Sequence, residues 1–131
     1  MANTFKVVTF AAEPASAGTA YKMYTVAGST TTVVLGLVLT NIHSSAVTAE
    51  VELVSDTGSR GGANNVTNGT SFLAKDVNIP AGSSLELLSG GKVVLEATDE
   101  IKIDCSVADK LSGTLSANVN VTMPDSVEKT Y

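Results

Sequence analysis

Short apolar segments separated by turn signals fill residues 75–103, and this pattern limits the chain to folds built from short strands. The turn signals lie at residues 79–82, 89–92 and 97–99, where proline, glycine, serine and aspartate gather. The segments between them are too short for a stable helix and are rich in valine, leucine and isoleucine. This spacing is typical of antiparallel sandwiches and barrels.

Alternating apolar residues predict strands along the rest of the chain. Residues 30–41 are apolar on both faces, so we expect a central strand that is covered by the partner sheet on one side and by a loop or a neighbouring subunit on the other. Gly36 in its middle indicates a bulge or the close approach of another backbone. The predicted strands are 5–10, 21–26, 30–41, 49–54, 72–77, 85–88, 92–95, 100–105 and 114–123.

Eight or nine strands without a convincing helix predict an all-β fold, an antiparallel β-sandwich of the jelly-roll or Greek-key type. A length of 131 residues suits one domain, so residues 1–131 are expected to form a single sandwich. Alternate positions of the strongest strands should supply the core. These core positions are Val33, Leu35, Leu37, Leu39, Val51, Leu53, Ile101, Ile103, Val119 and Val121.

Residues 55–70 form a polar loop with four glycines and no large apolar side chain. Such a loop is flexible until something orders it. Two interpretations stay open: an unconstrained hairpin tip, and a contact to a neighbouring subunit or an exposed tip on a particle. In the second, Arg60 is the expected anchor because a guanidinium can bridge a carboxylate, and Asn64 and Asn65 join it in the contact. The charged tail 125–131 is expected to be loose.

The net charge of −5 and the pI of about 4.6 argue against nucleic acid as a partner. A protein that neutralises several phosphates needs clustered lysine and arginine, whereas Arg60 is the single arginine here and the lysines are scattered. The longest apolar stretch, residues 33–39, is too short to span a bilayer, and the first residues do not read as a signal peptide. We therefore expect synthesis in a cytoplasm and no membrane partner.

One cysteine and one histidine leave little room for catalytic or zinc chemistry. Cys105 shares a face with Ile101 and Ile103, so a small core residue is expected rather than a nucleophile. His43 follows the 30–41 strand in a polar turn, where a solvated histidine is the usual case. No nucleophile lies beside a base that a third group could orient.

Carboxylate and amide oxygens offer two weaker possibilities. The pairs Glu50 with Glu52 and Asp99 with Glu100 are expected to be a solvated strand face and a turn, respectively, rather than a glycosidase dyad. Asp56, Asn64, Asn65 and Asn68 provide oxygen donors in one loop, but they lack the ordered spacing of a calcium loop. The sequence therefore predicts no enzyme, no cofactor and no metal.

Several motifs follow one another in a fixed order along the chain. They are the opening 1–6, the segment 24–37, the Lys75-Asp76 pair, the Pro80-Ala81-Gly82 turn, the leucine-rich segment 85–88, the Gly91-Lys92 turn and the element 94–102. In this order they resemble small structural proteins of tailed bacteriophages, especially cyanobacterial phages, including capsid decoration or cement proteins. The matches cover most of residues 1–107, and the longer loop at 55–70 departs from the family pattern.

The resemblance implies a non-enzymatic virion protein, with no catalytic residues to carry over. The first hypothesis is a decoration or cement protein that binds the assembled capsid as a homo-oligomer, with a trimer favoured. One alternative is a subunit of the neck, tail or a fibre. An alternative of a different class is a carbohydrate-binding module for host adsorption. The expected partners are capsid or other virion proteins, and the expected location is the virion.

Overall fold

Nine strands make up the secondary structure of the computed structural model, which describes residues 2–55, 69–88 and 91–121. The described part contains no helix, and so no helix that could cross a membrane. The strands are β1 (Ala2–Glu13), β2 (Tyr21–Thr25), β3 (Thr30–Asn41), β4 (Val47–Val54), β5 (Thr70–Ile79), β6 (Ser84–Leu87), β7 (Val93–Leu95), β8 (Glu100–Cys105) and β9 (Leu111–Val121).

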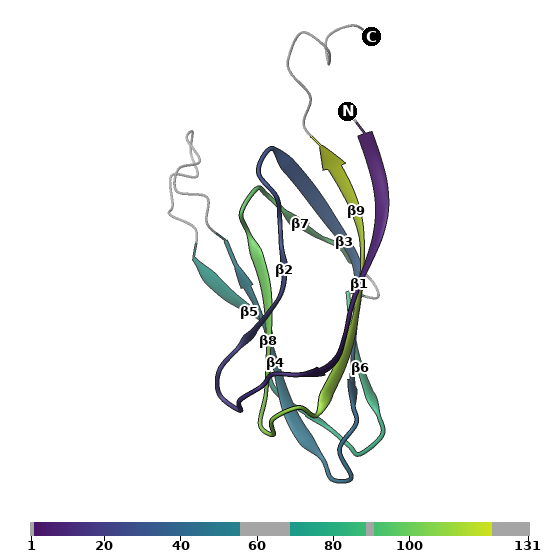
Figure 1. The fold of residues 1–131 in the computed structure, drawn as a ribbon, viewed down its shortest axis with the longest axis vertical. Helices are drawn as coiled ribbons and strands as arrows, with labels where there is room; N and C mark the ends of the chain where they lie inside the picture. The colour runs from purple at the N-terminus through teal and green to yellow at the C-terminus, as the bar shows by residue number, and fades with distance from the viewer. Residues whose placement is uncertain (1, 56–68, 89–90, 122–131) are drawn as a thin grey trace, which may run out of the picture.

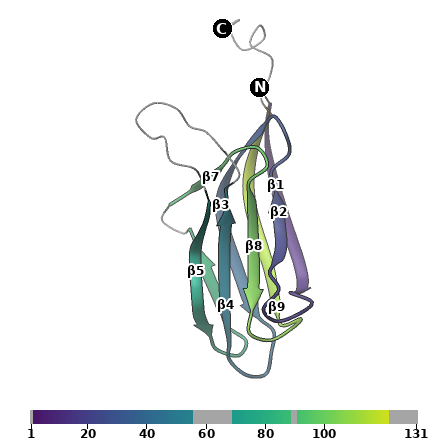
Figure 2. The same ribbon diagram turned by 90° about the vertical axis from the view of Figure 1, so that its left-hand side faces the viewer.

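The strands form two antiparallel sheets that pack face to face (Figure 1). The five-stranded sheet has the order β1-β9-β3-β6, with β7 also paired to β3. The four-stranded sheet has the order β2-β8-β4-β5, and Figure 2 shows its strands side by side in front of the other sheet. Since β6 and β7 pair with different halves of β3, they act as one interrupted strand. With β6 and β7 taken as one, the order is that of a jelly roll, which confirms the predicted fold class.

Two of the three predicted turns, at residues 79–82 and 97–99, are confirmed, and the third, at 89–92, lies partly outside the described residues. In the turn between β5 and β6, the Ser83 amide donates to the Pro80 carbonyl over 3.0 Å, and Gly82 takes a φ of 72°. A positive φ at this position is what a type II turn requires, and glycine adopts it without strain. The turn before β8 is closed by the Asp99 amide, which donates to the Glu96 carbonyl over 3.1 Å.

A bulge in β3 decides which side chains of this strand enter the core. The register against β9 shifts between Val34 and Gly36, so the bulge expected at Gly36 is confirmed. The extra residue moves the alternation by one position. Leu37 and Leu39 are therefore buried, whereas Val33 and Leu35 lie half-buried on the outer face. The expectation that Val33 and Leu35 belong to the core is wrong for this reason.

The core between the sheets confirms half of the predicted set. Leu37, Leu39, Val51, Ile101 and Ile103 are fully buried, whereas Leu53 and Val119 are half-buried. The side chain of Val121 lies outside the described part of the structure. The Cys105 side chain is 3% exposed within the cluster, which confirms its predicted place in the core. Further buried apolar residues are Phe10, Met23, Val26, Val34, Val47, Ala49, Ala74, Ile79, Leu95, Leu111, Leu115 and Ala117.

Phe10 on β1 and Gly113 on β9 face each other across the ladder. The Phe10 ring lies over the glycine and packs edge-on against Tyr21, with 5.3 Å between ring centroids. A Cβ at position 113 would lie within 3 Å of two carbons of this ring. The glycine therefore makes room for the aromatic ring of Phe10.

Replacing Gly113 by alanine should lower the free energy of unfolding by about 1–3 kcal/mol, because the new methyl group must displace the Phe10 ring. Urea unfolding followed by circular dichroism measures the loss. The double variant Gly113→Ala with Phe10→Leu provides the control, since the smaller side chain leaves space for the methyl group. If Gly113→Ala costs the same in both backgrounds, the ring does not occupy the space above the glycine.

Candidate interaction surface

The predicted contact residues Arg60, Asn64 and Asn65 lie outside the described residues, as do the candidate calcium donors Asp56 and Asn68. The same holds for the tail 125–131. The base of the loop is described: the Ser55 amide donates to the Gly69 carbonyl over 3.1 Å. This bond continues the ladder between β4 and β5 by one step, so the hairpin is closed below the loop.

The outer face of the five-stranded sheet carries a patch of apolar side chains. One row across the sheet runs from Phe5 on β1 through Asn118 on β9 and Val33 on β3 to Val94 on β7. The next row contains Val7 and Ser116 beside the bulge at Gly36. We call this surface the apolar outer face. Its members with apolar side chains are Phe5, Val7, Val33, Leu35, Val38 and Val94.

Several side chains of the apolar outer face are accessible to solvent. Phe5 is 76% exposed, Val7 61% and Val94 59%. Phe5 and Val7 line a shallow hollow of about 320 Å³ together with Leu35 and Ser116. The central position predicted for β3 is confirmed, and its inner side is covered by the other sheet. The cover predicted for its outer side, a loop or a neighbouring subunit, stays a prediction. Exposed patches of this kind mark interaction surfaces in soluble proteins.

Asn118 lies within the apolar outer face, between Phe5 and Val33 in the cross-strand row. Its Oδ1 atom is buried and accepts no hydrogen bond from the described residues. Buried side-chain oxygens are paired in the large majority of cases, because an unmade hydrogen bond costs free energy. The apolar outer face therefore contains one buried oxygen, Asn118 Oδ1, that accepts no hydrogen bond from the described residues.

The opposite sheet presents charge instead. On the outside of β2 and β8, Lys22 pairs with Glu100 over 3.0 Å and Lys102 lies 3.9 Å from the same carboxylate. On β4 and β5, Lys75 pairs with Glu50 and with Asp76. The hydrogen bond from Lys75 Nζ to Glu50 and the nearby Asp76 carboxylate raise the pKa of Lys75 above its usual value.

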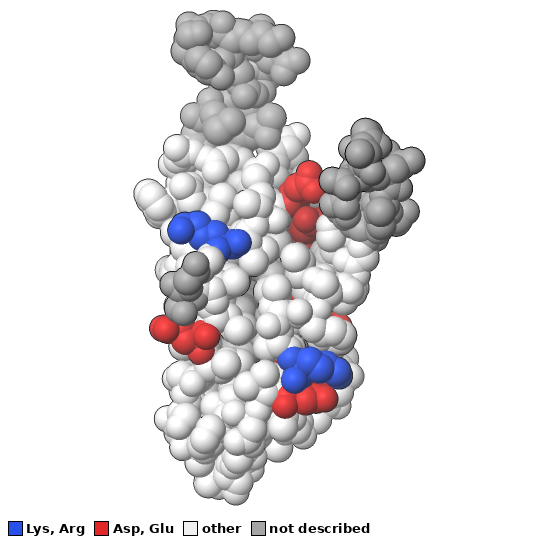
Figure 3. Space-filling model, turned by 180° about the vertical axis from the view of Figure 1, so that it is seen from behind, with Lys and Arg blue, Asp and Glu red and all other residues white. Residues whose placement is uncertain are grey.

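The two outer faces therefore differ in character. Among the positions that face outward in the ladders of β3 with β6, β7 and β9, the only charged residue is Glu86, opposite Val38. The space-filling view from behind shows charged side chains in a few separate groups on a largely uncharged surface (Figure 3). No known protein family, curated protein or solved structure matches this chain.

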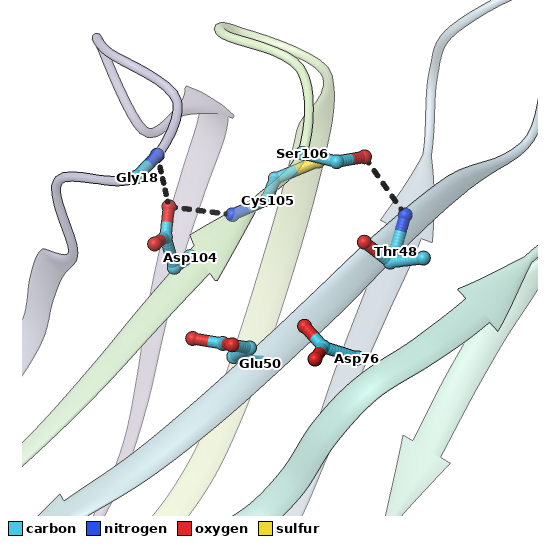
Figure 4. Close-up of a pocket in the computed structure, with 7 residues that line it drawn as sticks. All are labelled: Gly18, Thr48, Glu50, Asp76, Asp104, Cys105 and Ser106. Atoms are coloured by element: carbon cyan, nitrogen blue, oxygen red, sulfur yellow. Dashed lines mark hydrogen bonds between the residues drawn. The ribbon is translucent and has the colours of Figure 1, made fainter.

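A small acidic pocket of about 200 Å³ lies at one end of the four-stranded sheet (Figure 4). Its carboxylates are Glu50, Asp76 and Asp104. Asp104 Oδ1 accepts hydrogen bonds from the backbone amides of Gly18, at 3.1 Å, and Cys105, at 2.8 Å. Glu50 is engaged by Lys75. These carboxylates hold backbone and lysine in place, and no group of three histidine, cysteine or acidic side chains in the described part could bind a metal ion.

The other candidate polar residues also have structural partners. Asp99 is buried and its Oδ2 accepts the Glu96 amide over 2.9 Å, which confirms the predicted turn role. The His43 backbone amide donates to Asn41 Oδ1 over 2.7 Å in the turn after β3. Asn41 was not among the residues predicted from the sequence, although its side chain is fully buried and joins three segments. Its position at the end of an apolar strand, before a Ser-rich turn, was the available signal.

Proposed function

We propose that this chain is a non-enzymatic structural protein of a bacteriophage particle, which attaches to the assembled capsid as a homo-oligomer. The observation that supports this best is the apolar outer face, an exposed surface with almost no charge on a chain of net charge −5. Such a surface suits a protein-protein contact. The motif order that resembles phage decoration proteins and the jelly-roll fold agree with this proposal, although jelly rolls also occur in lectins and cupins.

The distribution of aromatic side chains favours this function over a carbohydrate-binding module. The two aromatic residues with large exposure in the described part are Phe5 and Phe72. They lie on β1 and β5, which belong to different sheets. A sugar ring needs aromatic side chains gathered on one face, next to polar groups that fix its orientation. The Phe72 ring is also engaged by Lys75, whose Nζ lies 5.0 Å from its centroid.

A neck, tail or fibre subunit is the second candidate, because the same surfaces would serve in a particle component of lower copy number. The proposed partners are capsid or other virion proteins, with the virion as location. Three copies per oligomer, as expected from the sequence, stays a prediction, since no feature of the described residues specifies that number.

An add-back assay tests the proposed attachment. The gene is deleted from the phage that encodes it, and the purified chain is added to the resulting particles. We expect the chain to sediment with the particles and to saturate at on the order of hundreds of copies, as repeated attachment to a symmetric lattice requires. Saturation at far lower numbers would favour the neck or fibre. Binding to host-cell glycans without binding to particles would overturn the proposal.

Replacing residues 56–68 by a short glycine-based turn should leave the melting temperature of the isolated protein nearly unchanged. The hydrogen bond between Ser55 and Gly69 already closes the hairpin below this segment. Attachment to particles should weaken, because the segment contains Arg60. Differential scanning calorimetry and the add-back assay measure the two effects. A shortened protein that unfolds early but attaches normally would show that the loop serves the fold.

A further inference from the structure

The sandwich has four sheet edges in its described part, and three of them carry features that prevent pairing with other chains. Unpaired N–H and C=O groups at an edge can pair with another strand unless short length, bulges or charges prevent it. β2 has 5 residues, a register shift and Lys22, while β6 and β7 have 4 and 3 residues. β5 contains two register shifts against β4 and carries Lys75 and Asp76.

The fourth edge, β1, lacks most of these features. It has 12 residues, and its ladder with β9 runs without a shift from Ala2 to Phe10. Within residues 2–10 the sequence has no proline or glycine, and Lys6 is the single charge. Apart from this ladder, no backbone hydrogen bond of the described residues engages residues 2–12. The open side of β1 is therefore long, regular and rich in β-branched and aromatic residues.

The same strand carries the most exposed part of the apolar outer face. Phe5 and Val7 point outward from β1, at 76% and 61% exposure. A strand added beside β1 would place its own side chains next to these two and cover them. Backbone pairing and apolar burial would then act together, as in complexes formed by strand addition.

We propose that β1 pairs antiparallel with β1 of a second copy, so that two five-stranded sheets join into one sheet across a two-fold axis. This inference rests on the self-association included in the proposed function. A second copy fits because two identical strands related by a two-fold axis are self-complementary. Charge points the same way: copies of net charge −5 repel one another, and they meet here through residues 2–10 of β1, which carry one lysine, no acidic residue and part of the apolar outer face.

The pairing has a definite geometric consequence. If the antiparallel pairing is centred on Phe5 or on Val7, outward-facing residues of one copy lie opposite outward-facing residues of the other, so the outward side chains of both copies share one face. In these two registers the two Lys6 residues do not lie opposite each other. The cross-strand row that runs from Val94 to Phe5 then continues onto β1 of the second copy. Because the contact has two-fold symmetry, the smallest assembly is a dimer rather than the trimer expected from the sequence.

The test compares Val7→Lys with Val94→Lys in the full chain. Both valines lie on the same outer face with nearly equal exposure, 61% and 59%, but only Val7 is on β1. Sedimentation equilibrium should show a dimer for the wild type, a dissociation constant at least about tenfold higher for Val7→Lys and an unchanged one for Val94→Lys. Circular dichroism confirms that each variant is folded.

Hydrogen exchange supplies a second measurement that does not depend on the variants. Of residues 3–9, the alternate amides that point away from β9 should gain protection as the wild-type concentration rises, while the amides of β5 should not. Dimers in both variants, or equal weakening in both, would place the contact elsewhere and overturn the β1 inference alone. A trimer would overturn the two-fold pairing. A wild type that stays monomeric would overturn the inference and the homo-oligomer, but the virion role is tested separately by particle binding.

Discussion

Replacing Leu37 by alanine is expected to lower the free energy of unfolding by about 2–5 kcal/mol, the range for a fully enclosed leucine. The Leu37 side chain is 1% exposed and follows the bulge of β3. Its cross-strand neighbours are Leu115 on β9 and Leu87 on β6, so truncation opens a cavity in the middle of the five-stranded sheet. Urea unfolding of the purified protein measures the loss.

Leu35→Ala is the matched control, since the same truncation is made two residues earlier on the same strand. Leu35 is half-buried on the apolar outer face, so its loss should be about 1 kcal/mol or less, in line with the smaller area that it buries. The difference between the two variants tests the position of the bulge. Equal losses would mean that the alternation of β3 runs unbroken and that Leu35 belongs to the core.

Replacing Asn41 by alanine should cost about 2–3 kcal/mol, because several buried backbone groups lose their partners at once. Asn41 is fully buried, and its Nδ2 donates to the carbonyls of Ser45, at 2.9 Å, and Ile79, at 3.0 Å. Its Oδ1 accepts the His43 amide. The side chain thus ties the end of β3 to the following turn and to the end of β5.

The control for this prediction is Asn78→Ala, on an exposed position of β5 next to Ile79. That change removes the same amide and should alter the free energy of unfolding by less than about 0.5 kcal/mol. Thermal unfolding of both variants provides the comparison. A small loss for Asn41→Ala would show that water satisfies the freed groups and that the segments do not depend on the amide.

The strands predicted most accurately were those that end at clear polar turns. The bounds of Thr30–Asn41 and Glu100–Cys105 were predicted correctly, because the first is rich in β-branched residues, the second alternates charged with apolar residues, and both end at polar turns. β1 was predicted as residues 5–10 but extends from Ala2 to Glu13. Its weakly patterned ends form strand because β9 pairs with them, a tertiary effect that local sequence does not encode.

Which face of a strand enters the core was harder to predict. Alternation in residues 5–10 divides Phe5 and Val7 from Val8 and Phe10, but both sets are apolar, so the pattern does not select the inner one. The ladder with β9 does so, because it aligns Phe10 with Gly113 and Val8 with the buried Leu115. The exposure of Phe5 and Val7, on which the candidate surface depends, therefore follows from pairing. In β3 the bulge likewise decides which side chains enter the core, and the sequence pattern alone did not show this.

The amount of this chain in purified phage particles tests the proposed function most directly. Particles are purified by density-gradient centrifugation, and the chain is quantified against the major coat protein by mass spectrometry with labelled peptide standards. A protein that decorates a capsid should be present at on the order of hundreds of copies per particle, since it repeats with the lattice. Absence of the chain from particles that are otherwise complete would contradict the account.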